Sequence, residues 1–200
     1  MTDFRPTPLK TAAIIAAVFI WTAPAVLAAD IEAGKRKAET CAACHGLSGN
    51  STDPAIPSIA EQPAQFISTQ LYFFREGSRK NAQMSAIASN LKNADLNDLA
   101  AYFSVQKAAS AKTLAPEKIE TGKRLSQQFN CVACHGATLL GQQHIPRLAG
   151  QHAEYLRTQL RGFQAGTRFD MDGNMTSAAR ALPAAEIDVL ADYLASLGTP

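Results

Sequence analysis

The sequence predicts an all-α fold in which one helical module occurs twice. The chain matches itself when it is shifted by about 90 residues, and the match extends over most of its length after residue 30. Within each half, apolar side chains recur every three or four positions, which is the spacing of a helix that buries one face. No segment shows the convincing apolar–polar alternation that is typical of a strand. We therefore expect two tandem helical domains and no β-sheet.

The composition excludes several classes of protein. With 46% hydrophobic and 18% charged residues, the chain of 200 residues has enough apolar surface to fold. It is neither a disordered chain nor a protein of many membrane spans. Its net charge of +2 is too small for a protein that holds nucleic acid by electrostatic attraction. We therefore expect no nucleic-acid partner.

Residues 1–28 have the pattern of a secretory signal peptide. Arg5 and Lys10 give a positively charged start, an apolar run follows at Ala12–Ile20, and small residues lead to a cleavage site at the end of the range. The alternative is a retained membrane anchor, because the charge-free stretch 11–29 is just long enough to cross a bilayer. The short apolar core favours cleavage.

The repeat places one domain in residues 29–109 and the other in residues 110–200. Two copies are too few for a solenoid, so we expect two globular domains. The segment Ala108–Pro116 lies between them. It consists of small residues without an aromatic side chain and ends in proline, which is typical of a linker.

Three helices are expected in the first domain. The stretch Ile31–Thr40 is rich in helix formers and runs directly into the first cysteine motif. Residues 66–74 carry apolar side chains at helical spacing, and Gly77 lies where that helix would stop. Residues 96–103 form one apolar helical face, which Asn93 can cap.

The second domain repeats these three helices. Pro116–Phe129 runs into the second cysteine motif, and residues 155–163 have the same helical spacing as their counterpart. Gly166 lies at the expected end of that helix. Residues 187–194 form the last apolar face, and Pro183 fits the first turn of the helix that carries it.

All four cysteines lie in two copies of one motif, Cys41-Ala-Ala-Cys44-His45 and Cys131-Val-Ala-Cys134-His135. Cys-x-x-Cys-His is the attachment signature of c-type haem. Two thiols three positions apart on a helical turn can each add to one vinyl group of a porphyrin, and the next residue is the proximal iron ligand. A zinc site needs four ligands and a redox dithiol follows a strand, and neither condition is met. The sequence therefore predicts two covalently bound haem c groups.

Methionine is the expected distal ligand, because His/Met pairs are the axial ligands of electron-transfer cytochromes c. The first half offers Met84, and the second offers both Met171 and Met175. An aligned leucine follows Met84 and Met175 after the same interval of seven residues. Both methionines are expected in polar loops and not on an apolar helical face, which argues against a packing role. We therefore assign Met84 and Met175 as distal ligands.

Two further pairs of residues each have two interpretations. Pro57 and Pro146 follow the cysteine motifs and are either plain turn residues or the source of a carbonyl that accepts the Nδ1–H of the proximal histidine. Arg79 and Arg168 occupy equivalent positions of the repeat. They either meet haem propionates through the planar guanidinium fork or form a solvated surface pair.

The matching runs define a family resemblance. In the first half they are CAACHGLSGNS, IPSIAEQ, FISTQLYFFREGSRKNAQM and DLAAYF; in the second they are CVACHG, IPRLAGQ, YLRTQLRGFQAGTR and VLADYLASL. Over about Ile31 to Leu197 the chain resembles the cytochrome c4 family, which consists of periplasmic di-haem proteins with two fused class I cytochrome c domains. The resemblance implies the following ligands: Cys41, Cys44, His45 and Met84 for one haem, and Cys131, Cys134, His135 and Met175 for the other.

The resemblance also implies a function. A protein of this kind is a periplasmic carrier of single electrons between redox protein partners of a respiratory chain, and a respiratory complex or a terminal oxidase is a candidate partner. It is not an enzyme, since the haem carries the chemistry and the protein tunes it. Peripheral association with a membrane is compatible with this function.

Two alternatives come from other classes. A di-haem peroxidase needs an iron with an open or displaceable sixth position and a longer chain, and a distal methionine in both halves argues against it. The second alternative is the cytochrome subunit of a redox enzyme complex such as flavocytochrome c sulfide dehydrogenase. Its haem sites would have the same sequence pattern, so this alternative stays open.

Overall fold

The computed structural model describes Met1, residues 28–111 and residues 113–198. Nearly all of the predicted signal peptide therefore lies outside the described residues. Within these ranges the chain is helical and forms no strand, only an isolated bridge between Gln142 and Ile145. This confirms the all-α fold that the sequence predicts.

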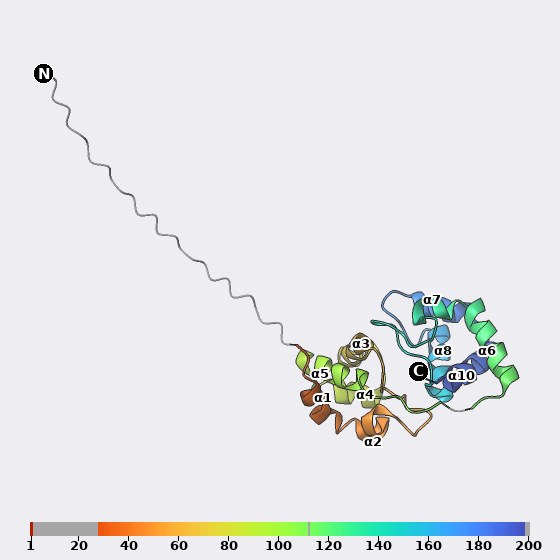
Figure 1. Cartoon of the computed structure of the whole chain (residues 1–200), viewed down its shortest axis with the longest axis horizontal. Coiled ribbons are helices and arrows are strands. Elements are labelled where there is room, and N and C mark those ends of the chain that lie inside the picture. Colours follow the sequence, from red (N-terminus) through yellow and green to blue (C-terminus); the bar gives the residue numbers. More distant parts are fainter. Residues whose placement is uncertain (2–27, 112, 199–200) are drawn as a thin grey trace.

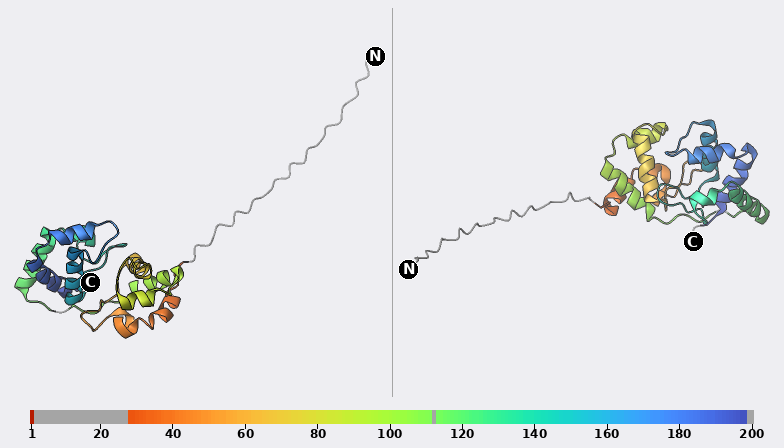
Figure 2. Two further views of the ribbon diagram at one scale, coloured as in Figure 1. Left: turned by 180° about the vertical axis from the view of Figure 1, so that it is seen from behind. Right: turned by 90° about the horizontal axis from the view of Figure 1, so that it is seen from above.

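The helices form two groups that follow each other along the chain. The first group contains α1 (Ile31–Ala38), α2 (Ala42–His45), the 3-10 turn η1 (Leu47–Gly49), α3 (Ala64–Arg75), α4 (Ala82–Ala88) and α5 (Asn93–Ser104). The second contains α6 (Pro116–Gln128), α7 (Cys131–His135), α8 (Ala153–Ala165), α9 (Asn174–Ala181) and α10 (Ala184–Ser196). The two groups lie side by side in all three views (Figures 1 and 2).

The predicted helices before and between the motifs form as expected. Helices α1 and α6 end one or two residues before the predicted boundaries, and α3 and α8 contain the predicted ranges 66–74 and 155–163. Gly77 and Gly166 end α3 and α8 with φ values of 73° and 68°. Glycine adopts this left-handed conformation at little cost, which explains why both helices end there.

The predicted starts of α5 and α10 are wrong by one position. Asn93 is the first residue of α5 and not its cap; Lys92 precedes the helix, and its N–H donates to Oδ2 of Asp95 at 2.7 Å. The carboxylate one turn inside the helix thus takes over the capping function. Pro183 directly precedes α10 instead of lying in its first turn.

A glycine marks the helix crossing in each half. Helix α1 packs across α5, and a Cβ at Gly34 would lie 2.0 Å from the carbonyl oxygen of Asp98. Helix α6 packs across α10, and a Cβ at Gly122 would lie 2.1 Å from Cβ of Tyr193. Only a residue without a side chain allows such close helix axes, so the Gly-Lys-Arg run occurs in both halves for a packing reason.

Each half has its own apolar core. In the first half the buried members are Ala38, Ile67, Leu99, Ala100 and Phe103. In the second half two clusters contain Leu139, Ala149, Leu156, Ala191, Tyr193 and Leu194, and Leu125, Leu182, Ile187 and Leu190. Most of these side chains come from α1, α3 and α5 in the first half and from α6, α8 and α10 in the second. The short cysteine-containing helix of each half lies at the edge of its core.

None of the helices within residues 28–111 and 113–198 combines the length and the apolar character that crossing a membrane requires.

Candidate haem sites

Each cysteine motif forms a short helical turn at the edge of a core. The N–H of His45 donates to the carbonyl oxygen of Cys41 at 2.9 Å, which brings the two ends of the motif onto one turn. Cys41 and Cys131 pack against the apolar clusters, and burial raises the pKa of both thiols. Cys44 and Cys134 are exposed, and none of the four cysteines forms a disulfide bond. One exposed and one half-buried thiol on the same turn, next to an apolar surface, fit covalent attachment of a porphyrin.

The histidine of each motif is buried and held by one hydrogen bond. His45 is 8% exposed, and its Nδ1 lies 2.9 Å from the carbonyl oxygen of Pro57. His135 is 7% exposed, and its Nδ1 lies 2.8 Å from the carbonyl oxygen of Pro146. Of the two interpretations of these prolines, the carbonyl acceptor is therefore confirmed.

This hydrogen bond decides which ring nitrogen of each histidine is available. A carbonyl oxygen only accepts, so Nδ1 carries the hydrogen and Nε2 keeps its lone pair. Burial lowers the pKa of His45 and His135, although the bonds to the proline carbonyls oppose the shift. Both rings are thus neutral, oriented and able to donate Nε2 to a metal. This is the state that a proximal haem ligand requires.

The surrounding donor set matches haem better than a metal ion held by side chains alone. Across the described ranges, no group of three or more histidine, cysteine, aspartate or glutamate residues is arranged to hold a metal ion. Two thiols and one histidine at each site suffice only if the remaining iron ligands come from a porphyrin and one further residue.

The two methionines assigned as distal ligands lie on short helices that the sequence did not predict. Met84 is the third residue of α4, and Met175 is the second residue of α9. Both are partly buried, whereas Met171 precedes α9 and is 69% exposed. The expectation of a polar loop is therefore wrong for Met84 and Met175. Their function as distal ligands stays a prediction.

The helix caps explain why these segments are helical. The side chain of Asn81 accepts the N–H of Met84 at 2.9 Å. The carboxylate of Asp170 accepts the N–H groups of Met175 and Thr176 at 2.7 and 3.1 Å. A capping side chain satisfies backbone donors that the first helical turn leaves free. In both halves the cap thus holds the backbone of the methionine itself.

Arg79 and Arg168, one from each half, meet in a single cluster. Arg79 Nη2 donates to Tyr155 Oη and to Gln159 Oε1 at 3.0 Å each, and Arg168 Nη1 donates to the same Oε1 at 2.6 Å. Each guanidinium also lies over a phenylalanine ring of its own half. The interpretation as a freely solvated pair is therefore wrong.

The cluster has an excess of positive charge. Burial, followed by the neighbouring charge of Arg79, lowers the pKa of Arg168 to about 10. Among the described residues, no carboxylate lies within ion-pair distance of either guanidinium. Two like charges in a partly buried site favour a bound anion between or beside them. Propionate is an anion of this kind.

The comparisons with known proteins follow the same division into halves. A family model described as cytochrome c matches residues 31–106 and, a second time, residues 119–198. The chain therefore belongs to the cytochrome c class of haem proteins, with one such domain in each half.

Two comparisons identify the family within this class. Cytochrome c4 of Pseudomonas aeruginosa is 35% identical, and the alignment covers 85% of this chain and 90% of that protein. The crystal structure of reduced recombinant cytochrome c4 from Pseudomonas stutzeri superposes with a TM-score of 0.79 at 33% identity, covering 85% of this chain and all of that one. The chain belongs to the cytochrome c4 family of di-haem electron-transfer cytochromes and carries two covalently bound haem c groups.

A third relative has a different description. The thiosulfate dehydrogenase electron acceptor of Thiomonas intermedia is 31% identical over 98% of this chain and 94% of that protein.

Proposed function

We propose that this chain carries single electrons between redox proteins in the periplasm. The observation that carries the proposal is the pair of buried, neutral histidines, each with Nδ1 held by a proline carbonyl and Nε2 available. Two such sites in one chain fit a protein that takes electrons from one partner and passes them to another. When bound, haem c supplies a one-electron couple at its iron.

The residues of each half have defined roles in this proposal. The cysteine thiols would hold the porphyrin, and histidine Nε2 and the methionine thioether would ligate its iron. The ligands are Cys41, Cys44, His45 and Met84 in the first half, and Cys131, Cys134, His135 and Met175 in the second. The caps of α4 and α9 support this assignment, because they fix the backbone from which each thioether projects.

Arg79 and Arg168 receive the propionates in this proposal. Their guanidinium groups are partly buried and lack a carboxylate partner among the described residues, so carboxylates from the two porphyrins would neutralise them. Because Gln159 Oε1 accepts from both arginines, the cluster would hold the anionic edges of the two porphyrins close to each other.

The acceptor that we propose is a respiratory complex or a terminal oxidase. A second candidate function is that of the electron-accepting partner or subunit of a periplasmic dehydrogenase. The relative described as a thiosulfate dehydrogenase electron acceptor, which aligns with nearly the whole chain, favours this candidate. Reduction of the purified protein by a sulfur-compound dehydrogenase, compared with its oxidation by membranes that contain a terminal oxidase, separates the two functions.

The ligand assignment is tested by removing each methionine in turn. Met84→Ala should open the first haem alone to carbon monoxide, and Met175→Ala should open the second. Met171→Ala is the matched control and should leave both haems closed. A thioether favours ferrous iron, so each opened haem should also have a lower potential.

The results that contradict the proposal are specific. If Met171→Ala opens the second haem and Met175→Ala does not, the wrong methionine has been assigned. If the unmodified protein binds carbon monoxide at one haem stoichiometrically, a catalytic function replaces the carrier function. If serine at all four cysteine positions leaves haem covalently attached, the attachment sites are wrong.

The periplasmic location is tested by the form of the mature chain. Cleavage of residues 1–28 predicts a protein that begins at Ala29 and lacks Trp21, the only tryptophan. The mature protein should therefore show no tryptophan fluorescence. An intact amino terminus in the membrane fraction would instead indicate a retained anchor.

A further inference from the structure

The peptide group between Pro57 and Ser58 has both of its polar ends engaged. Its carbonyl oxygen accepts the Nδ1–H of His45 at 2.9 Å. Its N–H donates to Oε1 of Gln151 at 2.9 Å, and Gln151 belongs to the other half of the protein. One peptide group therefore connects a histidine of the first half to a glutamine of the second.

The second half contains the same arrangement with the halves exchanged. The carbonyl oxygen of Pro146 accepts the Nδ1–H of His135 at 2.8 Å. The N–H of Arg147, which belongs to the same peptide group, donates to Oε1 of Gln62 at 3.0 Å. Gln62 and Gln151 follow these prolines at the same interval of five residues, so the connection is reciprocal.

Each glutamine is held by a second hydrogen bond to the same residue. Gln151 Nε2 donates to the carbonyl oxygen of Ser58 at 2.7 Å, and Gln62 Nε2 donates to that of Arg147 at 3.0 Å. Both glutamine residues are only 3% exposed. The amide orientation is thus determined, and water has little access to compete for the peptide N–H.

Hydrogen bonds in such a chain polarise one another. An acceptor on the peptide N–H makes the carbonyl oxygen of the same peptide more negative and hence a stronger acceptor for the histidine Nδ1–H. A stronger bond at Nδ1 raises the basicity of Nε2, and a more basic proximal ligand stabilises ferric over ferrous iron. Each glutamine would thus act on the histidine of the opposite half through a single peptide group.

We propose that Gln62 and Gln151 are positioning residues that each lower the reduction potential of the haem in the opposite half. The proposal rests on His45 and His135 as proximal ligands, as proposed above. It assigns a second function to the domain interface: besides holding the halves together, the interface adjusts both iron centres. Any change that separates the halves would raise both potentials together.

The test replaces each amide by a thioether of similar length. Gln151→Met should raise the potential of the first haem and leave the second unchanged, and Gln62→Met should do the opposite. The expected change is up to about tenfold in the equilibrium constant for reduction, or about 59 mV for one electron. Gln65→Met and Gln127→Met are the matched controls, since both side chains are exposed, and they should change neither haem.

The potentials are followed haem by haem in a titration monitored by nuclear magnetic resonance, with signals assigned through the Met84→Ala and Met175→Ala proteins. The Nδ1–H resonance of the opposite histidine should also move upfield in each glutamine variant, since its hydrogen bond weakens. A role in packing alone would not move this resonance.

Glutamate variants provide the rescue. Gln151→Glu and Gln62→Glu keep an oxygen that accepts from the same peptide N–H, whether or not the carboxyl group is protonated. The potential of the opposite haem should therefore stay unchanged or fall. A rise equal to that of the methionine variants would contradict the proposal.

The failures of the two proposals are distinguishable. If the parent protein shows no Nδ1–H resonances of iron-bound His45 and His135, the ligand assignment is wrong. If these resonances are present but each glutamine variant shifts the haem of its own half, both haems equally, or neither, the ligand assignment stands and the cross-domain effect is wrong.

Discussion

The histidines of the two cysteine motifs show how far a single side chain depends on its immediate surroundings. The short helix carries each histidine into a buried site, and burial alone would leave the ring without a defined tautomer. The proline carbonyls at 2.9 and 2.8 Å remove this freedom in both halves. An oriented, neutral imidazole loses little further entropy when it binds iron, so the site is prepared before ligation.

The crossing glycines give a prediction about stability. Gly34→Ala would place a methyl group 2.0 Å from an atom of the opposing helix α5, and Gly122→Ala would place one 2.1 Å from an atom of the opposing helix α10. The helices must move apart, which should lower the free energy of unfolding by about 1–3 kcal/mol in each case. Denaturation of the haem-containing protein by guanidinium chloride measures the loss.

Gly198→Ala is the control for the crossing glycines, because no atom of the described residues outside its chain neighbours lies within 4 Å of a Cβ at Gly198. Its unfolding midpoint should match that of the parent. An unchanged midpoint for Gly34→Ala or Gly122→Ala would mean that close helix contact does not explain why glycine occurs at both positions.

The sequence predicts the chemistry of the site well and its fine geometry less well. Spacing alone identifies the Cys-x-x-Cys-His turns, because the chemistry requires those residues at that interval. The acceptor carbonyl of Pro57 was one of two interpretations, since a proline in a loop does not reveal where its oxygen points. The two arginines were predicted as equivalent residues, but their meeting at Gln159 depends on how the halves pack.

The pairing of α1 with α5 combines close packing with charge. Asp98 Oδ1 accepts the N–H of Asp30 at 2.8 Å, and Asp98 Oδ2 accepts from Lys37 Nζ at 2.9 Å. One carboxylate on α5 thus binds the start and the last turn of α1. The bond from the Asp30 N–H, followed by that from Lys37, lowers the pKa of Asp98.

This shift predicts how stability depends on pH. Asp98 has a lower pKa when folded than when unfolded, where it is about 3.9. Its contribution is therefore complete above the unfolded pKa and is lost as the pH falls through the folded pKa. The stability difference between the parent and Asp98→Asn should be constant near neutral pH and shrink below about pH 4.

Urea titrations at several pH values measure this difference. Glu39→Gln is the control, because it removes a carboxylate that is exposed at the end of α1. A difference for Asp98→Asn that stays constant down to pH 2 would show that the carboxylate charge does not hold α1 against α5.

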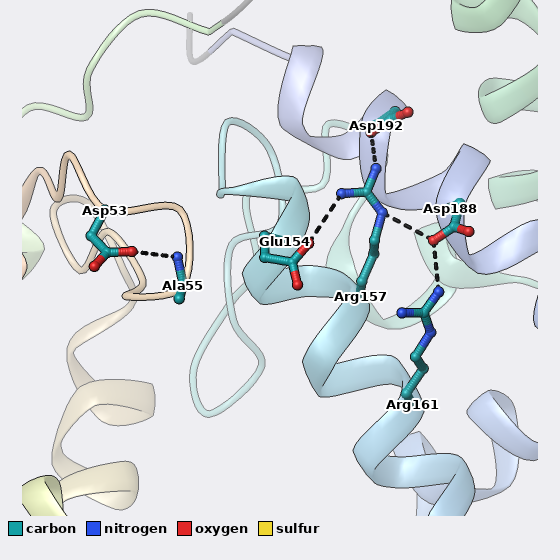
Figure 3. Close-up of polar contacts among 7 residues, drawn as sticks. All are labelled: Asp53, Ala55, Glu154, Arg157, Arg161, Asp188 and Asp192. Atoms are coloured by element: carbon teal, nitrogen blue, oxygen red, sulfur yellow. Dashed lines mark hydrogen bonds and ion pairs between the residues drawn. The ribbon is translucent and has the colours of Figure 1, made fainter.

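The pairing of α8 with α10 depends on an arginine network (Figure 3). Arg157 binds Asp188 at 3.0 Å and Glu154 at 3.7 Å, and it also contacts Asp192. Arg161 binds Asp188 at 2.9 Å, and its side chain is 56% exposed compared with 21% for Arg157. A central, partly buried charge with several partners contributes more than a peripheral one.

These differences predict unequal effects of two similar substitutions. Arg157→Met should lower the free energy of unfolding by about 1 kcal/mol at low salt, and Arg161→Met by a few tenths. In about 1 M salt the loss for Arg157→Met should shrink, because the charges are screened. Equal losses for both variants, or a loss independent of salt, would contradict the network interpretation.

The helices that the sequence missed share a physical cause. Helices α4 and α9 have only seven and eight residues, too few for a clear apolar period. They form because Asn81 and Asp170 cap them and because α3 and α8 lie beside them. The longer helices were predicted because a buried face of 12 or 13 residues repeats its pattern several times.

The interface between the halves is polar and reciprocal. Gln62 and Gln151 reach across it in opposite directions, and the N–H of Tyr155 donates to the carbonyl oxygen of Pro54 at 3.1 Å. These partners are 85 to 101 residues apart in the sequence, so local patterns carry no information about them. The repeat indicates that the two halves resemble each other, but not which faces meet.

Arg147 is the most deeply buried charge at this interface. It is 1% exposed, and its Nη2 donates to the carbonyl oxygen of Ala60, in the other half, at 2.9 Å. Its Nη1 contacts the carbonyl oxygen of Ala149, whereas its Nε has no hydrogen-bond partner among the described residues. Burial lowers the pKa of Arg147, which the charge of Glu61 opposes. The guanidinium thus satisfies two carbonyl groups that water does not reach.

Removing this guanidinium should uncouple the halves. Arg147→Met leaves the carbonyl oxygens of Ala60 and Ala149 without their partner, at a cost of about 1–3 kcal/mol for each buried group. Loss of the buried charge offsets part of this cost, so we expect a net loss of about 1–2 kcal/mol. Because the lost bond to Ala60 crosses the interface, calorimetry should resolve two unfolding transitions in the variant and a single one in the parent. Arg124→Met, which removes an exposed arginine that donates to Gln128 on its own helix, should keep the single transition. A single transition at an unchanged temperature in Arg147→Met would show that the other contacts across the interface hold the two domains together without this guanidinium.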